Sequence, residues 1–121
     1  MRYMDRLKKR PDFLRTAKGR KAVRPGLVLQ ARQRDVKGPF RVGFTATKKI
    51  GNAVVRNLAK RRLRAAARAI LPVHANCNYD YVLIARQQTP VRNFENIIQD
   101  LTCALDEVHG ERHNNSTKKI A

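Results

Sequence analysis

The sequence predicts a single α+β domain in which helices pack on a small mixed β-sheet, with elements in the order α-β-β-α-β-α. Two kinds of pattern predict this class. Some segments are rich in β-branched and aromatic residues, as strands are, and others carry apolar residues at the spacing of amphipathic helices. The predicted strands are 26–34, 40–47 and 79–85, and the predicted long helices are 53–71 and 90–108. With 121 residues, of which 42% are hydrophobic, the chain can bury one core.

The two ends of the chain are expected to lie outside this domain. Residues 1–10 are highly charged and show little periodicity, so we interpret them as a basic arm that a partner orders. Residues 110–121 are polar and are expected to form a disordered tail. The domain itself should therefore span residues 11–109.

The first elements of the domain are a short helix and two strands. Pro11 suits the first position of a helix, Asp12 favours the helix dipole from the first turn, and Gly19 ends the helix. The strands 26–34 and 40–47 are separated by a turn that contains Lys-Gly-Pro. We expect these two strands to pair as a hairpin.

The second half of the domain adds two helices around one strand. Asn52 is expected to cap the helix from Ala53 to Leu71, and Pro72 to end it. The strand 79–85 has an almost unbroken apolar end, as a buried central strand would have, and a helical crossover makes it a candidate parallel neighbour of 40–47. Thr89 and Pro90 then suit the start of the last helix.

Charge is distributed very unevenly along the chain. The formal net charge is +18, and residues 1–72 hold 22 Lys or Arg against three Asp, whereas residues 73–121 hold five basic and six acidic residues. Between Asp35 and Asp80 there is no acidic residue. Such a charge predicts a polyanionic partner that binds the first part of the chain.

One half of the predicted helix 53–71 is continuously cationic. Arg56, Lys60, Arg64 and Arg68 follow one another at i,i+4 intervals, Asn52, Asn57 and Arg61 share their half, and apolar residues from Val54 to Ile70 occupy the other. Solvated helix faces usually intersperse Glu with Lys, because like charges at i,i+4 repel. A polyanion that offsets this repulsion is therefore favoured over a merely solvated face. Arg62 projects from the apolar half, so it must snorkel or pair with a carboxylate such as Asp80.

The start of the same helix is a candidate phosphate site. Lys48 and Lys49 stand just before Gly51-Asn52, so two ammonium groups and the free N–H groups of the first helical turn converge. Many helix starts share this geometry without a ligand, which leaves a purely structural turn as the alternative.

Residues that could provide acid-base catalysis or hold a metal are scarce. His74, His109 and His113 are the only histidines, and the i,i+4 spacing of the last two would make a ligand pair only on a helix that Gly110 disfavours. Cys77 and Cys103 are expected to be buried, reduced thiols. We therefore predict no catalytic residue and no metal ligand in the protein.

The central part of the chain resembles the signature of the ribonuclease P protein family. The similar block runs from Arg41 to Arg64 and reads R-V-G-F-T-A-T-K-K-I-G-N-A-V-V-R-N-L-A-K-R-R-L-R, with the core Arg-Asn-x-x-Lys-Arg at residues 56–61. The resemblance extends to R-L-K-K before D-F near the N-terminus and to Y-D-Y-V-L-I-A-R before the last helix. It implies the order α-β-β-β-α-β-α, with one more short strand near the arm or hairpin, and a left-handed parallel crossover.

The resemblance also implies a function. In this family the protein assists a catalytic RNA that removes the 5′ leader from precursor transfer RNA, with Mg²⁺ held mainly by RNA. The implied partners are that RNA and the precursor, with no membrane and no stable protein partner, and the location is the cytoplasm. The expected RNA contacts are Lys48, Lys49, Asn52, Arg56, Asn57, Lys60, Arg61 and Arg64, to which the helix face adds Arg68.

A cleft between the first helix and the sheet is implied to hold the leader, lined by Phe13 and Phe44. The chain departs from the family where further aromatic residues are common, because it has Ala17 and Gln30 there. Leader binding is therefore expected to rely more on Arg32 and Arg34. The alternative for both phenylalanines is a plain core position. A structural RNA-binding protein and a DNA-binding protein remain the rival functions.

Overall fold

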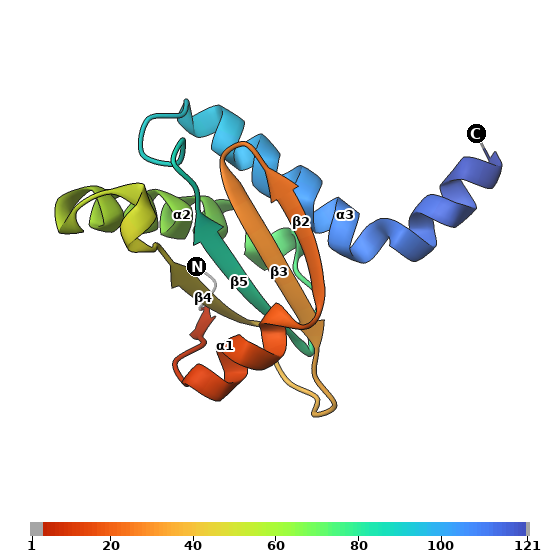
Figure 1. Cartoon of the computed structure of the whole chain (residues 1–121). Coiled ribbons are helices and arrows are strands. Elements are labelled where there is room, and N and C mark those ends of the chain that lie inside the picture. The colour runs from red at the N-terminus through yellow and green to blue at the C-terminus, as the bar shows by residue number, and fades with distance from the viewer. Residues whose placement is uncertain (1–3, 121) are drawn as a thin grey trace.

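The computed structural model describes residues 4–120, with side chains described as far as residue 110. It confirms an α+β fold with one mixed sheet (Figure 1). The elements are β1 (Asp5–Arg6), α1 (Arg10–Ala17), β2 (Arg20–Arg24), β3 (Leu27–Gln33), β4 (Arg41–Thr45), the 3-10 helix η1 (Lys48–Ile50), α2 (Ala53–His74), β5 (Tyr79–Ala85) and α3 (Phe94–Ile120).

The strands lie in the order β1-β4-β5-β3-β2, with β5 at the centre. β5 pairs parallel with β4, as predicted, and antiparallel with β3. The predicted hairpin of β3 with β4 is wrong, because β5 is inserted between them. The reason is that β5 is the most apolar strand, with Val82 and Leu83 almost fully buried on opposite faces, so it is stabilised most at the centre.

The helices cover the two faces of the sheet unequally. α2 and α3 pack on one face and on each other, whereas the short α1 contacts β3 and β5 from the other face. Figure 1 shows α2 behind the sheet and β5 to the right of β4 when both strands point upward. The β4-α2-β5 crossover is therefore left-handed, as the resemblance implies and against the usual preference.

The residue pattern did not locate two edge strands, β1 and β2, although the resemblance implies one more short strand near the arm or hairpin, and β2 takes that place in the order. β1 pairs parallel with β4 inside the segment interpreted as a basic arm, and the next residue, Leu7, is 4% exposed. β2 pairs antiparallel with β3 and buries Ala22. Both strands are hard to detect because one has two residues and the other reads R-K-A-V-R, with a single small residue turned to the core. Residues 1–3 of the arm lie outside the described part.

The predicted helix ends differ from those in the structure. α2 continues through Pro72 to His74, because a proline in the last turn forfeits only one backbone hydrogen bond. α3 begins at Phe94, not at Pro90, and Thr89 instead joins a turn to the β2–β3 connection by donating to the Gly26 carbonyl at 2.7 Å. α3 is assigned to Ile120, across the predicted disordered tail; the side chains after Gly110 lie outside the description, so the boundary at residue 109 stays a prediction.

The core lies between the sheet and the pair α2 and α3. α2 buries Ala59, Leu63, Ala66, Ala67 and Leu71 there. Its predicted apolar half is only partly buried, since Val54 is 76% exposed. The first turns of α2 extend past the edge of the sheet in Figure 1, and Val54 belongs to the first of these turns.

Candidate nucleic-acid interface

The nine residues predicted to contact RNA lie together on η1 and the exposed side of α2. We call them the cationic surface: Lys48, Lys49, Asn52, Arg56, Asn57, Lys60, Arg61, Arg64 and Arg68. Three of them, Arg56, Lys60 and Arg64, are half-buried along the edge of the core, and the others are exposed. Within the described side chains none of the cations forms an ion pair, so their mutual repulsion at i,i+4 is not offset inside the protein.

The turn before α2 fixes how η1 meets the helix. The Asn52 side-chain oxygen accepts a hydrogen bond from the Val55 amide at 3.0 Å, which is the predicted N-cap. Gly51 has φ of 149°, a conformation that a residue with a side chain rarely adopts. Because the Val55 amide donates to the Asn52 side chain, this amide is not available to a phosphate at the helix start. Lys48 and Lys49 are thereby held beside the helix start, and the phosphate site itself stays a prediction.

Phe44 supports the cationic surface and does not line the cleft. The register of β4 places Val42 and Phe44 on the face that α2 covers, opposite the face that α1 covers. The guanidinium groups of Arg64 and Arg6 lie 5.5 and 5.7 Å from the centre of the Phe44 ring. The expectation that Phe44 lines a leader cleft is therefore wrong, because strand alternation turns it toward α2.

Arg6 is a cation at this surface that the sequence analysis did not single out. Burial, and then the neighbouring charges of Arg6 and Arg68, lower the pKa of the Arg64 guanidinium from its usual range. β1 thus brings one more positive charge to the middle of α2, while its acidic residue, Asp5, is the register partner of Arg41 and turns to the opposite face of the sheet. Only the pairing of β1 with β4 shows this, since Arg6 and Arg64 are far apart in sequence.

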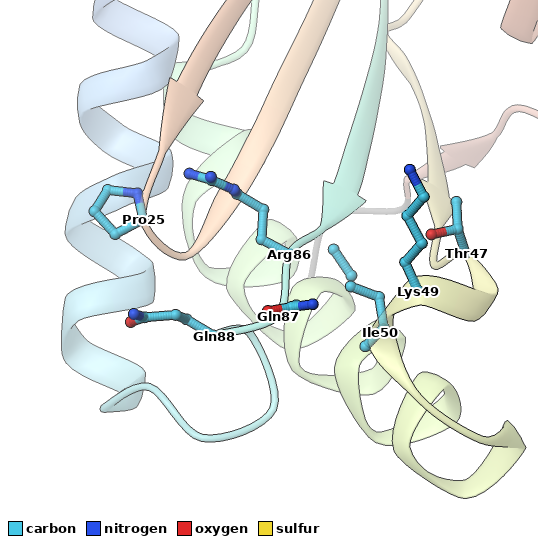
Figure 2. A pocket seen from close by; sticks show the side chains of 8 residues that line it. Pro25, Thr47, Lys49, Ile50, Arg86, Gln87 and Gln88 are labelled. Atoms are coloured by element: carbon cyan, nitrogen blue, oxygen red, sulfur yellow. The ribbon is translucent and has the colours of Figure 1, made fainter.

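A polar pocket of about 550 Å³ adjoins the cationic surface at the carboxyl ends of β4 and β5. Figure 2 shows that Lys49 from η1 and Arg86, Gln87 and Gln88 from the segment after β5 line it. Two cations and two amides can receive a phosphate and polar groups of a nucleotide. The residue pattern does not predict this pocket, because the parallel pairing of β4 with β5 creates it.

The second face of the sheet is only partly covered by α1, and we call it the open sheet face. Register and strand alternation assign to it Val28, Gln30, Arg32, Arg41, Gly43, Thr45, Asp80, Val82 and Ile84. The Phe13 ring of α1 lies directly on Gly43: a Cβ atom added there would be 2.5 Å from Phe13 Cζ. Phe13 therefore lies between α1 and this face, its contact with a leader stays a prediction, and Ala17 is exposed at the end of α1.

Positive charge on the open sheet face is paired with acids. Arg41 donates to both carboxylate oxygens of Asp80, at 2.8 and 2.7 Å, and lies 3.5 Å from Asp12 Oδ2. Arg15 also pairs with Asp12. We call the series Arg15, Asp12, Arg41, Asp80 and Arg34 the ionic chain. The hydrogen bonds to Asp80 raise the pKa of the Arg41 guanidinium.

The two arginines predicted to bind the leader differ in this respect. Arg34 Nε lies 3.4 Å from Asp80 Oδ1 without hydrogen-bond geometry, and its terminal nitrogen donates to the Pro39 carbonyl. Arg32 has no acidic partner among the described side chains and lines a small pocket of about 250 Å³ with Arg20 and Tyr79. Arg32 is therefore the better placed of the two for an RNA phosphate.

The side chain of Arg62 neither ends in solvent without a partner nor pairs with Asp80. It donates to the Arg92 carbonyl and lies 5.9 Å from the centre of the Phe94 ring. The predicted pair with Asp80 is wrong, because Asp80 faces α1 on the other side of the sheet. Arg62 instead ties α2 to the start of α3.

The histidines and cysteines are placed differently from the prediction. His109 lies in α3, where Nε2 is 2.6 Å from the Tyr81 hydroxyl and the ring meets Tyr79 edge to face. Cys77 and Cys103 are free but exposed, so the expectation of buried thiols is wrong: they lie in a loop and on the outer side of α3. Among the described residues no group of three His, Cys, Asp or Glu could hold a metal ion.

In the described part of the chain, every helix is too short or too polar to cross a membrane.

Comparison with known proteins gives one consistent family. The Ribonuclease P family model matches residues 1–109. The ribonuclease P protein component of Caulobacter vibrioides is 50% identical over 115 residues, covering 94% of this chain and 77% of that protein. The ribonuclease P protein of Staphylococcus aureus has a TM-score of 0.70 at 30% identity, covering 86% of this chain and 94% of that chain, and the Thermotoga maritima protein has 0.72 at 25%, covering 86% and 97%. Its fold, its signature block and these relatives together show that the chain belongs to the bacterial ribonuclease P protein family.

Proposed function

We propose that this chain binds the catalytic RNA of ribonuclease P through its cationic surface and the 5′ leader of precursor transfer RNA on its open sheet face. In this way it promotes removal of the leader and maturation of the transfer RNA 5′ end. The family relation supports the role in transfer RNA processing. The observation that carries the binding proposal is the acid-free run of cations on α2, whose repulsion only an external polyanion can offset.

The dimensions of the cationic surface suit an RNA backbone. Residues 56–68 span about 20 Å along the helix axis, which is the length of several phosphates. The exposed members, Arg61 and Arg68 on the helix and Lys48 and Lys49 before it, offer donors along this whole length. The half-buried Arg56, Lys60 and Arg64 are restrained by packing, so they would lose less conformational entropy on binding.

The open sheet face suits a single strand. Phe13 offers part of an aromatic ring, and Arg32 offers a cation without an acidic partner among the described side chains. With Gln30 and Ala17 in place of aromatic residues, stacking is limited, and each stacked base would contribute about 1–3 kcal/mol. The pocket of Lys49 and Arg86 lies where the cationic surface ends, and it could receive a leader nucleotide next to the catalytic RNA.

Catalysis is proposed to reside in the RNA. Mg²⁺ prefers oxygen ligands and would be held mainly by phosphates, with the protein contributing binding and position. The proposed location is the cytoplasm, and the proposed complex contains RNA without a stable protein partner.

The test is cleavage of a precursor transfer RNA by a bacterial ribonuclease P RNA at low Mg²⁺, with and without this protein. We expect the protein to raise the cleavage rate and the substrate affinity, because it adds phosphate contacts that Mg²⁺ would otherwise have to supply. Unchanged rate and affinity would refute the proposed function.

A double variant tests the binding surface. Arg56→Ala with Lys60→Ala should weaken binding to the catalytic RNA and lower the salt slope of log K by about two, because each lost phosphate contact lowers it by about one. The matched control is Arg24→Ala with Lys37→Ala, which removes two charges outside the cationic surface. An equal loss in both variants would show that only the net charge matters.

A further inference from the structure

Asp12 is an unexpected residue at its place in the fold. It is one of three acids in the first 72 residues, and it lies beside the face on which we propose that an RNA strand binds. Electrostatics alone would favour a neutral residue there, because a carboxylate repels phosphates. Asp12 is nevertheless only 8% exposed, and its carboxylate oxygens lie against two arginines, Arg15 and Arg41.

A local role in the helix does not account for this geometry. A carboxylate in the first turn of α1 favours the helix dipole from any orientation near the helix end, and the pair with Arg15 is an ordinary i,i+3 contact. The second oxygen, Oδ2, points out of the helix and lies 3.5 Å from Arg41 Nη1 on β4. The acid therefore connects α1 to the sheet.

The sheet side of this connection is rigid. Asp80 is 1% exposed and binds Arg41 through two hydrogen bonds, and Asp80 lies on the central strand β5. Arg41 therefore presents its remaining nitrogen in one fixed direction, toward α1. The ionic chain thus fixes the position of the first turn of α1 relative to β5.

The residues around Asp12 are those that touch the sheet. The neighbouring Phe13 ring lies on Gly43, and Thr16, one turn further, is fully buried and donates to the Asp12 carbonyl at 2.8 Å. One turn of α1 therefore carries the ion pair, the aromatic ring and the buried hydroxyl. A displacement of this turn would move Phe13 relative to Arg32 and change the width of the leader site.

We propose that Asp12, acting through Arg41 and Asp80, is a positioning residue that fixes α1 over the open sheet face and thereby sets the affinity for the leader. This inference rests on the proposed function. The carboxylate of Asp12 repels the nearby RNA, but its pair with Arg41 fixes the geometry of the binding site. Asp12 is not proposed to touch RNA.

The sign of one effect tests this. Asp12→Asn removes one negative charge, so electrostatics alone predicts tighter binding of a precursor with a long leader. Positioning predicts weaker binding, with the affinity ratio between a long-leader precursor and one with a single leader nucleotide falling about fivefold, a loss of about 1 kcal/mol. Both affinities are measured with the protein assembled on the catalytic RNA.

Glu107→Gln is the matched control. It also removes one negative charge, and it breaks one pair with an arginine, that of Glu107 on α3 with Arg24, at 3.0 Å. The ratio of its affinities for the long-leader and short-leader precursors, which we call the leader ratio, should not change. Asp12→Glu keeps the charge and should restore much of the ratio if the carboxylate reaches Arg41.

Two outcomes would overturn the inference: an unchanged or raised leader ratio for Asp12→Asn, or the same fall for Glu107→Gln. Binding of the catalytic RNA through α2 is measured in parallel and should be unchanged in Asp12→Asn. If that binding is absent already in the wild type, the proposed function fails instead, so the two failures are distinguishable. Thermal unfolding of each variant verifies that it is folded.

Discussion

The cationic surface of α2 and the open sheet face beside α1 differ in whether their positive charges are paired with acids. From Lys48 to Arg68 no acid occurs in the sequence, and the described side chains form no ion pair there. On the open sheet face, by contrast, Arg41 and Arg34 both lie against Asp80, and Arg41 also reaches Asp12. Both regions are proposed to meet RNA, yet only one is electrostatically prepared for it.

This difference indicates a division of labour. An unpaired row of cations gives affinity that is long-ranged, tolerant of sequence and sensitive to salt. A paired network gives little net attraction to a polyanion, because its charge is neutralised, but it holds its side chains in one geometry. The α2 region should therefore supply most of the binding energy. The open sheet face should mainly determine the geometry in which the RNA strand is held.

The largest effect on stability is expected in the paired region. Asp80→Asn removes the carboxylate that accepts two hydrogen bonds from Arg41, and it should lower the free energy of unfolding by about 3 kcal/mol, the lower end for a broken buried pair. Glu107→Gln breaks an exposed pair and should change it by less than about 1 kcal/mol. Urea unfolding measures both. A loss below about 1 kcal/mol for Asp80→Asn would mean that the pair of Arg41 with Asp80 stabilises the fold no more than the exposed pair of Arg24 with Glu107.

A methyl group at Gly43 should disturb the geometry of the open sheet face. In Gly43→Ala the new Cβ would stand 2.5 Å from Phe13 Cζ and 3.2 Å from Leu7 Cβ, so the ring must move. We expect a destabilisation of about 1–2 kcal/mol, and partial recovery when Phe13→Leu is added. Gly38→Ala is the control, since its nearest atom would be 3.5 Å away. If Gly43→Ala is as stable as Gly38→Ala, α1 does not pack as described.

The same two regions differ in how far the sequence predicts them. Helical periodicity and the absence of acids locate the cationic surface, because all its members lie within one continuous segment of 21 residues. The ionic chain joins Asp12, Arg41 and Asp80, which are distant in sequence, and only the strand order brings them together. A pattern of single residues contains no information about that order.

The errors have the same origin. The hairpin of β3 with β4 follows from the preference for pairing neighbours in sequence, which the apolar character of β5 overrides. The pair of Arg62 with Asp80 and the placement of Phe44 in the cleft both assume a face of the sheet, and a face is fixed only by register. The predicted helix end at Pro72 failed because the last turn of α2 accommodates a proline, and the predicted start at Pro90 failed because Pro90 belongs to the turn in which Thr89 bonds to the Gly26 carbonyl.

In the unpaired region a single acid should stabilise the fold and weaken function. Lys60→Glu would lie one turn from both Arg56 and Arg64, replacing two repulsions by two i,i+4 pairs, and should raise the free energy of unfolding by about 0.5 kcal/mol. RNA affinity should fall, with a lower salt slope. Lys60→Gln removes the repulsion without adding ion pairs, so its free energy of unfolding should lie between those of the wild type and Lys60→Glu. A destabilised Lys60→Glu variant would mean that the cations are already offset within the protein.

The smallest expected effect is a response to pH that involves neither region. Burial, and next the charge of Arg20, lower the pKa of His109 below its usual 6.5, against an opposing contribution from Asp106. The neutral ring can accept from the Asn76 side chain at Nδ1, 3.1 Å away, and meets the Tyr81 hydroxyl at Nε2.

Because the folded state binds this proton less tightly than the unfolded state, the contribution of His109 is fully present above pH 6.5 and is lost as the pH falls through the lowered pKa. The wild type should therefore lose more stability than His109→Gln between about pH 8 and about pH 5.5 in thermal unfolding. His74→Gln, at an exposed position, should keep the wild-type difference. If His109→Gln loses as much stability as the wild type, protonation of His109 does not cause the loss of stability at low pH.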